Sequence, residues 1–439
     1  MTETIFALST PPGRSGVAVL RVSGSQAGPM VDALAGARPD PRDAALRSLR
    51  HDGGLIDRAL VLWFPGPGSF TGEDVAEFHV HGGPAIIEAM IAAFTALGGR
   101  PAEPGEFTRR AFEHGKMDLT EAEGLADLID AETEGQRLQA LAQMSGALKQ
   151  LYEAWRERLI SILAAIEGEI DFPDEEDVPD ALAATAGPPI DDLIAEMDAH
   201  LDDAHRGERV REGLSIAIIG APNAGKSSLL NRLARREAAI VTDIPGTTRD
   251  IVEVRLVIAG FSVTLADTAG LRETAEIVES EGIRRALARA EEADIRIGVI
   301  DSTDVSRNQE SPLPLRSADL AVLNKSDLAQ AEALTLPCRS IAVSARSGAG
   351  LDQAEAWLED TVRSLLSARE APALSRARHR RAVTEGREAL ARGRSMLSRA
   401  PELAGEDVRL AIRAMESLTG RIDVEDVLDR VFSQFCIGK

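Results

Sequence analysis

The chain has 439 residues, too many for one ordinary hydrophobic core, and this length predicts about three domains. Its formal net charge of −22 argues against broad, non-specific adhesion to nucleic acid or anionic membranes, although a local basic site is compatible with it. Two cysteines, Cys338 and Cys436, exclude a disulfide framework and a cysteine-rich zinc site. Because the sequence has neither a long apolar run nor a signal-peptide pattern, we expect a cytoplasmic protein without a membrane association.

Residues 1–118 alternate strand-like runs with glycine- and proline-containing turns, and two periodicities typical of helices lie between the strands. This mixture predicts an α+β domain rather than a β-barrel. Polar side chains gather at the turns, which suggests that the domain binds a ligand. They are Arg14, Arg21, Glu73, Asp74, Glu77, His79 and His81, followed by the polar run 104–118.

A helical pattern covers residues 119–210, is interrupted by an acidic loop around Pro173 and Pro179, and returns only after residue 374. We therefore predict a helical domain in two sequence-distant parts, 119–210 and 370–439, with another module inserted between them. The segment 376–400 is strongly basic, so it could attract nucleic acid locally, or it could be a solvated helix face.

The inserted module, residues 211–369, alternates six apolar strand-like runs with helical patterns, which predicts a doubly wound α/β sheet. Its first strand leads into GAPNAGKSS, a glycine loop followed by a helix. Gly220 and Gly225 would let backbone N–H groups converge on phosphate oxygens, Lys226 would reach the β- and γ-phosphates, and the Ser227 hydroxyl could bind Mg²⁺. This order of elements is typical of a phosphate-binding loop.

Two further motifs have the order that a GTPase requires. TDIPGTTRD offers Thr248 as a second Mg²⁺ ligand, in a loop that could order around a γ-phosphate. DTAG, at a strand end, would place Asp267 near the metal and the Gly270 N–H near the γ-phosphate.

The base would be bound by NKSD and SAR, which also follow strands. Asn324 and Asp327 could pair with the edge of guanine, whereas adenine lacks the 2-amino group that Asp327 would accept from. The Ala345 N–H could donate to the guanine O6. The predicted GTP-binding residues are Asn223, Ala224, Gly225, Lys226, Ser227, Ser228, Thr242, Asp243, Ile244, Pro245, Gly246, Thr247, Thr248, Asp267, Thr268, Ala269, Gly270, Asn324, Lys325, Asp327, Ser344, Ala345 and Arg346.

The motif DTAG is followed by Leu271, where a water-orienting glutamine would stand in a Ras-like switch. A leucine cannot orient water, and spacing alone does not choose among the acids that follow, Glu273, Glu276, Glu279 and Glu281. Arg249 is the nearest candidate for an arginine finger, but a monovalent cation could supply the same charge.

Such a cation could lie in an oxygen cage made by Asn223 and the backbone carbonyls of Thr242 and Ile244. An asparagine in a glycine loop can equally serve turn geometry alone. At the C-terminus, FCIGK contains Cys436; the basic last residue argues against a prenylation signal, and a thiol on a tail favours a reactive or substrate-proximal role.

These residues resemble the bacterial and organellar MnmE (TrmE) family of tRNA modification GTPases. The resemblance rests on TPPGRSGVAVLRVSG (10–24), FTGEDVAEFHVHGGP (70–84), the run 104–133, the GTPase motifs and the terminal FCIGK, and it covers essentially the whole chain. It implies a potassium-dependent GTPase that acts with the flavoprotein MnmG. Together they would form a 5-aminomethyl or 5-carboxymethylaminomethyl group on wobble uridine 34 of certain tRNAs.

The resemblance also implies cofactors and assembly. A tetrahydrofolate, 5-formyl or methylene, would supply the one-carbon unit to the domain 1–118, which would also dimerise, and FAD is expected on the partner only. GTP hydrolysis would drive dimerisation of the GTPase domains within a homodimer that forms a heterotetramer with MnmG.

The resemblance implies the following site residues. Arg21, Glu77, Lys116 and Lys439 would bind folate, Asn223, Thr242, Ile244 and Thr247 would hold K⁺, and Ser227 and Thr248 would hold Mg²⁺. Glu279 would position the attacking water beside Lys226, and Cys436 would take part in tRNA modification. One departure from the family pattern is His114, where asparagine is usual; it leaves Lys116 in place.

A function of another class is a regulatory GTPase that acts as a binding switch in ribosome assembly. The N-terminal domain and the FCIGK tail favour the modifying enzyme, because a switch of that kind would not need them. In the enzyme, Arg378, Arg380 and Arg381 are predicted to contribute a salt-dependent attraction for tRNA.

Overall fold

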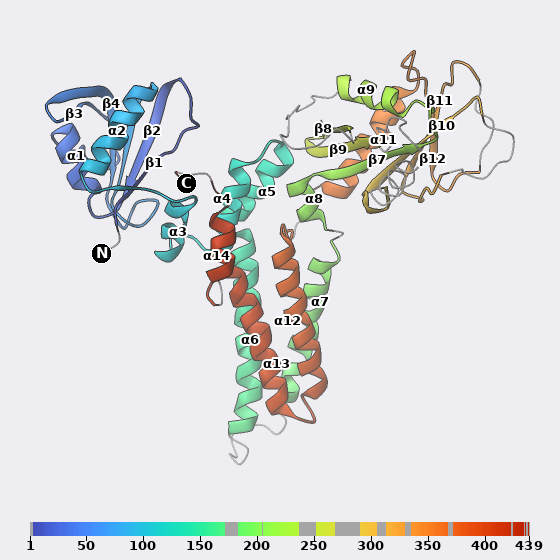
Figure 1. Cartoon of the computed structure of the whole chain (residues 1–439). Coiled ribbons are helices and arrows are strands. Elements are labelled where there is room, and N and C mark those ends of the chain that lie inside the picture. Colours follow the sequence, from blue (N-terminus) through green and yellow to red (C-terminus); the bar gives the residue numbers. More distant parts are fainter. Residues whose placement is uncertain are drawn as a thin grey trace, which may run out of the picture. The chain divides into compact units, whose positions relative to one another are not determined.

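The structure is a computed structural model that describes residues 3–171, 183–203, 205–236, 252–267, 290–304, 313–329, 335–367, 372–422, 425–433, 435 and 438 (Figure 1). The chain forms two compact units. Unit 1 comprises residues 1–129, 142–194 and 385–439, and unit 2 comprises residues 130–141 and 195–384. The boundaries of the four predicted domains stay predictions beside this division.

Unit 1 contains a six-stranded sheet with the order β3-β4-β5-β2-β1-β6. Its strands are β1 (Ile5–Leu8), β2 (Ser15–Ser23), β3 (Ala45–His51), β4 (Gly54–Phe64), β5 (Val75–Gly82) and β6 (Arg100–Pro101). Neighbouring strands are antiparallel except β1 and β6, which are parallel. The predicted α+β class is confirmed, but β3 and β6 were not predicted, because β3 mixes leucines with arginines and β6 has 2 residues.

Helices α1 (Ala27–Ala35) and α2 (Pro84–Ala96) cover one face of this sheet. Alternate residues of β2, β4 and β5 pack beneath them, and Leu20, Val61 and Phe78 are completely buried there. Successive side chains of a strand point to opposite faces of the sheet, so every second side chain packs in the core and the others lie on the opposite face. The residues that alternate with these core residues, including Arg21 and Glu77, therefore lie on the face away from α1 and α2.

The other part of unit 1 is helical. It contains α3 (Glu106–Glu113), α4 (Leu119–Ile129), α6 (Ala147–Asp171), the 3₁₀ turn η1 (Ala183–Ala186), α13 (Pro401–Thr419) and α14 (Glu425–Phe432). Three helices, α5 (Glu134–Met144), α7 (Gly187–Leu201) and α12 (Ala377–Met396), run from one unit into the other.

Sequence-distant helices α6 and α13 pack side by side (Figure 1). Trp155 and Leu159 of α6 are buried, as are Val408 and Met415 of α13. The two predicted parts of the helical domain thus share one core, which confirms that this domain is discontinuous. Within the described part of the chain, no helix is both long and apolar enough to cross a membrane.

The sheet of unit 2 has the order β12-β11-β10-β7-β9-β8. Its strands are β7 (Leu214–Gly220), β8 (Val252–Ile258), β9 (Phe261–Asp267), β10 (Ile295–Asp301), β11 (Leu320–Asn324) and β12 (Arg339–Ala342), with helices α8 (Arg206–Glu212), α9 (Lys226–Arg236) and α11 (Leu351–Leu366). All pairs are parallel except β8 with β9. All six predicted strands are present, and the doubly wound fold is confirmed.

The first turns of α5 belong to unit 2, although the sequence assigned them to the helical domain. The Gly135 N–H donates to the Gly260 carbonyl at 2.9 Å, and the Gln136 amide donates to the Arg211 carbonyl at 2.9 Å. A Cβ on Gly135 would lie 2.4 Å from the Phe261 ring. This close packing of α5 against the β8–β9 turn could not be read from helical periodicity.

Candidate functional site

The glycine loop between β7 and α9 requires glycine at two positions. Gly220 has φ 157° and Gly225 has φ 100°. A Cβ on Gly220 would lie 2.3 Å from the Val299 carbonyl oxygen, and one on Gly225 would lie 2.0 Å from the Asn324 amide nitrogen. The loop therefore lies too close to neighbouring backbone and side chains for any residue but glycine at these two positions. Its shape is that of a phosphate cradle.

Lys226 opens α9 and lies across this loop. Its side chain is buried, and its Nζ donates to the carbonyl oxygens of Gly220 and Ala221 at 2.8 Å each. Ser227 and Ser228 follow in the first helical turn and are exposed. The ammonium and the helix N-terminus thus put positive charge at the carboxyl end of β7, where the ligand of a doubly wound sheet binds.

Asn223 is exposed and adopts a left-handed backbone with φ 62°. Asparagine tolerates this conformation better than most residues, so the turn itself accounts for its presence. A role in cation binding stays a prediction.

Asn324, at the end of β11, joins the phosphate loop to the loop that follows β12. Its Nδ2 donates to the Ala224 carbonyl at 2.7 Å, and its Oδ1 accepts from the Ala345 N–H at 3.0 Å. The Ala345 N–H, predicted to bind the guanine O6, thus has a protein acceptor here, and it would have to share or exchange this bond. The sequence did not predict that Asn324 connects these two loops.

Asp301, at the end of β10, is a second residue that the sequence analysis missed. Its carboxylate pairs with the Lys325 ammonium and accepts hydrogen bonds from the N–H and the hydroxyl of Thr303. Burial by itself would raise the pKa of Asp301, but these partners outweigh it and hold the pKa below its usual value. Asp301 thus fixes Lys325 within NKSD; an acid at a strand end is the signal that could have found it.

The remaining base-binding candidates lie at the same sheet edge. Asp327 and Arg346 are exposed, whereas Ser344 is completely buried. The Ser326 N–H donates to the Val343 carbonyl at 3.2 Å, which connects the loop after β11 to the loop after β12.

In unit 1, Arg21 and Glu77 are directly paired across β2 and β5. Arg21 donates from Nε and Nη2 to Glu77 Oε1 at 3.0 and 2.8 Å, and His79 Nε2 lies 3.2 Å from Glu77 Oε2. The Arg21 guanidinium lies 5.5 Å from the centre of the Phe70 ring and 5.8 Å from that of Phe107. The structure thus brings two predicted folate residues together beside two aromatic rings.

Lys116, the third predicted folate residue, is exposed and donates to the Pro67 carbonyl at 2.9 Å. His114, the departure from the family pattern, lies with its Nδ1 2.8 Å from the Thr71 carbonyl oxygen and 2.9 Å from the Arg110 carbonyl oxygen. His114 thus helps to hold α3 against the loop before β5, and Lys116 follows it by two residues.

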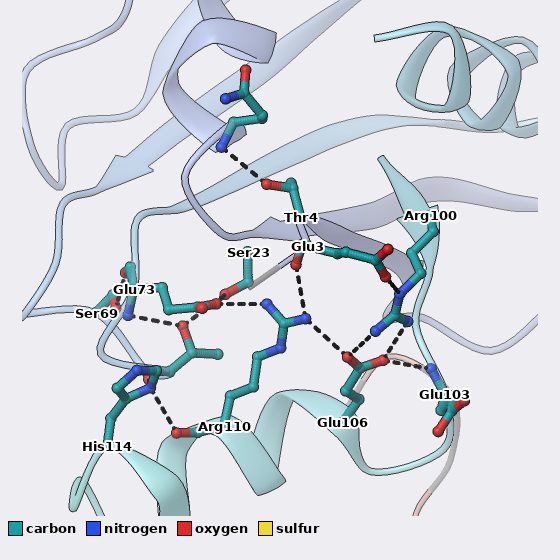
Figure 2. A network of polar contacts seen from close by, with 12 residues as sticks. Glu3, Thr4, Ser23, Ser69, Glu73, Arg100, Glu103, Glu106, Arg110 and His114 are labelled. Carbon is teal, nitrogen blue, oxygen red and sulfur yellow. Dashed lines mark hydrogen bonds and ion pairs between the residues drawn. The ribbon is translucent and has the colours of Figure 1, made fainter. Parts of the chain in front are cut away.

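A buried ion-pair network fixes α3 on the sheet (Figure 2). Arg110 donates to Glu73 at 2.8 Å, to Glu106 at 2.9 Å and to the Glu3 carbonyl at 2.9 Å. Arg100 also pairs with Glu106, at 2.6 Å. Glu73, predicted to belong to a ligand-binding cluster, is therefore a structural residue here.

Asp74 of the same predicted cluster is also structural, since its carboxylate accepts from the Gly66 N–H at 2.9 Å.

Near the C-terminus, Gly438 packs against the end of the first strand of the chain. Gly438 is buried, its carbonyl accepts from the Ser9 hydroxyl at 3.2 Å, and a Cβ on it would lie 2.6 Å from the Leu8 carbonyl oxygen. Strand β1 neighbours β2, where Ala7 is paired with Arg21. Gly438 thus packs on the strand next to the one that bears Arg21.

Family comparisons agree with this architecture. The model of the MnmE helical domain matches residues 119–436, and that of the GTP-binding protein TrmE N-terminus matches residues 4–116. The tRNA modification GTPase MnmE of Maricaulis maris is 65% identical over 441 residues, which cover 100% of both chains. Proteins of the same name from Parvibaculum lavamentivorans and Caulobacter vibrioides are 57% and 53% identical, again over 100% of both chains.

The chain belongs to the MnmE family of tRNA modification GTPases. As an MnmE family member it is an enzyme that binds and hydrolyses GTP in tRNA modification, and the alternative of a ribosome-assembly switch loses its support. Among solved structures, the G domain of the T. maritima FeoB iron transporter covers 34% of this chain and 98% of its own, at 22% identity and a TM-score of 0.25.

Three arginines of the basic segment 376–400 of this MnmE family member pair with carboxylates. Arg380 donates to Asp203 at 2.7 Å and to the Leu201 carbonyl at 2.6 Å. Arg394 pairs with Asp191 at 2.9 Å and Arg392 with Asp407 at 3.1 Å. The charge of Arg380 is thus engaged inside unit 2, and the expectation that Arg378, Arg380 and Arg381 attract tRNA stays a prediction.

Several predicted MnmE site residues lie outside the described residues, and their assignments stay predictions. They are Thr242, Asp243, Ile244, Pro245, Gly246, Thr247, Thr248, Thr268, Ala269, Gly270, Glu279, Cys436 and Lys439. Asp267 ends β9, at the sheet edge where it was predicted.

Proposed function

We propose that this GTPase depends on potassium and acts with a flavoprotein of the MnmG kind on wobble uridine 34 of certain tRNAs. The pair would form the 5-aminomethyl or 5-carboxymethylaminomethyl group there, and a tetrahydrofolate would supply the one-carbon unit. GTP hydrolysis would drive dimerisation of the GTPase domains and the accompanying conformational change. The family membership gives the reaction class, and the Arg21–Glu77 pair is the observation that carries the folate site.

The surroundings of Arg21 and Glu77 fit a flat, polar heterocycle with an acidic tail. Phe70, which is half-buried, offers aromatic surface, the completely buried Phe107 ring lies behind the Arg21 guanidinium, Glu77 can accept from ring N–H groups, and Arg21 can donate. Lys116 is exposed and could attract a carboxylate of the ligand. Lys439 directly follows Gly438, which packs on β1, and this supports its place in the same site.

The phosphate site supports the predicted metals in the same way. Ser227 and Thr248 would hold Mg²⁺, and Asn223, Thr242, Ile244 and Thr247 would hold K⁺ beside the phosphates. Ser227 and Asn223 are both exposed at the cradle. Bound there, the cations would supply positive charge for the transferred phosphoryl group, and Glu279 would orient the attacking water.

A second copy of the chain is the proposed occupant of the outer part of the N-terminal sheet. Leu46 and Leu60 are paired across β3 and β4 and are 57% and 43% exposed. A cross-strand leucine pair in water supports the homodimer that the family resemblance implies. We place the proposed active centre between the folate site of this domain and the C-terminal segment that contains Cys436.

The folate assignment predicts that 5-formyltetrahydrofolate raises the melting temperature of the full chain, because a ligand of the native state stabilises it by mass action. Glu77→Gln should abolish the rise, since an amide keeps the shape of the side chain but not its charge. Arg47→Ala on β3 is the control; Arg47 donates to the Ala37 and Leu46 carbonyls and should leave the rise intact. No rise in the native chain at saturating ligand contradicts the assignment.

The cation assignment predicts that replacing K⁺ by Na⁺ lowers the GTP hydrolysis rate by about 10-fold or more, because a charge at the transferred phosphoryl group is lost. Asn223→Ala should give the same low rate in both salts, and Glu279→Ala should be slow in both. Equal rates of the native chain in K⁺ and Na⁺ would exclude the cage.

A further inference from the structure

The loop that follows β12 is held from two sides. On one side, Asn324 accepts from the Ala345 N–H at 3.0 Å. On the other, Arg232 of α9 donates from Nε to the Ala345 carbonyl at 3.1 Å and from Nη2 to the Arg346 carbonyl at 2.7 Å. Both polar groups of the Ala345 backbone are thus bound, one by the strand edge and one by the phosphate-binding helix.

The position of Arg232 is set by the core of unit 2. Its neighbours Leu229, Leu230 and Leu233 are buried against the parallel sheet. Lys226 begins the same helix at the phosphate cradle, six residues before Arg232, and its Nζ is bonded to the cradle itself. One rigid helix therefore contacts both the phosphate loop and the loop after β12.

We infer that Arg232 is a positioning residue for base selection, which fixes the backbone of residues 344–346 against the edge of the nucleotide base. The guanidinium suits this role because its planar fork reaches two successive carbonyls at once, whereas a lysine ammonium is a single point of donation. The Ala345 N–H donates to Asn324, and it would share this hydrogen bond with, or pass it to, an oxygen at position 6 of the base, whereas an amino group at that position offers no acceptor.

This inference rests on the proposed assignment of NKSD and SAR to the guanine. The two parts of that assignment are separable by the choice of base. Inosine and guanine both carry an oxygen at position 6, and inosine lacks the 2-amino group, which Asp327 is proposed to accept from. Adenine carries an amino group at position 6 and also lacks the 2-amino group. The affinity ratio of GDP to IDP therefore reports the contact of the 2-amino group with Asp327. The ratio of IDP to ADP reports position 6 together with N1, which carries a proton in IDP and a lone pair in ADP, so the part of this ratio that Arg232→Ala changes while Asp327 is intact reports the 344–346 loop.

The experiment measures the dissociation constants of GDP, IDP and ADP for the full chain by competition against a fluorescent guanine nucleotide. Arg232→Ala should lower the IDP-to-ADP preference by about 10- to 100-fold, which corresponds to the loss of hydrogen bonds from a charged donor, and leave the GDP-to-IDP ratio unchanged. The IDP-to-ADP preference of Arg232→Lys should lie between that of the native chain and that of Arg232→Ala. Arg363→Ala on α11, which removes an exposed arginine paired with Glu359, should match the native chain in both ratios.

Asp327→Ala separates failure of the inference from failure of the assignment beneath it. If Asp327→Ala does not lower the GDP-to-IDP ratio, the proposed base site itself is wrong. If Asp327→Ala behaves as expected and Arg232→Ala keeps the native IDP-to-ADP preference, the role of Arg232 is overturned, even if the variant melts at a lower temperature. Should Arg232→Ala fail to fold, the same two ratios are decided with Arg232→Lys, which keeps the charge.

Discussion

The two sheets of this chain form their candidate sites from different parts of the strands. In unit 2 the sheet is mostly parallel and its inner strands β10 and β11 are buried along nearly their whole length, so the candidate site lies at strand ends and is made of loops. In unit 1 the sheet is mostly antiparallel and α1 and α2 cover one face, so the candidate site lies on the other face and is made of side chains in register. The first kind of site depends on backbone shape, and the second on pairing between strands.

The largest effect should come from breaking the backbone-built site. Gly225→Ala would put a Cβ 2.0 Å from the Asn324 amide nitrogen at a φ of 100°, so the loop must move. We expect GDP and GTP to bind at least about 100-fold more weakly, because more than about 2.7 kcal/mol of strain and lost contacts is involved. Titration with a fluorescent guanine nucleotide measures this.

Gly98→Ala is the matched control for backbone strain. Gly98 has φ 87° but no atom within 4 Å of the position of a Cβ. Gly98→Ala should lower the stability of unit 1 by about 1–2 kcal/mol and leave nucleotide binding unchanged. Native affinity in Gly225→Ala would show that the loop does not cradle the phosphates.

The second effect concerns the side-chain site in unit 1. Arg110→Ala would leave the buried carboxylates of Glu73 and Glu106 without their shared partner, at a cost of about 3–5 kcal/mol. Hydrogen–deuterium exchange should become faster in peptides from β1, β2 and α3 while unit 2 keeps its protection. Arg109→Ala, one residue away and exposed, should cost less than about 1 kcal/mol. Equal exchange in the two variants would contradict the network's role.

The smallest expected effect is a pH dependence of the stability of unit 1. Burial by itself raises the pKa of Glu106, but hydrogen bonds from Arg100, from the Glu103 N–H and from Arg110 outweigh it and hold the pKa below its usual value of 4.5. A lowered pKa in the folded state means that Glu106 contributes stability above about pH 4.5 and that this contribution is lost as the pH falls through the lowered pKa. Melting curves should show this loss in the native chain and a weaker one in Glu106→Gln. If the native chain and Glu106→Gln lost the same stability as the pH falls, Glu106 would not be the cause of this pH dependence.

Much of the fold follows from the sequence because its signals are local. Six apolar runs predicted the strands of unit 2, and the phosphate loop was identified from glycine and lysine spacing alone. The order of NKSD and SAR along the chain placed them at strand ends. Even the division of the helical domain followed from where periodicity stops and returns.

The structure alone decided how side chains are shared between distant segments. Asn324 joins two loops, Arg232 of α9 holds one of them, the loop after β12, and Glu73 pairs with Arg110. Arg380 looked like part of a free basic surface, yet it meets Asp203, 177 residues earlier. Sequence spacing carries no information on such pairs, because they depend on which elements pack together. Sequence by itself thus determined the strands of unit 2, most strands of unit 1 and the family resemblance, and only tertiary packing decided which charged groups hold the protein together.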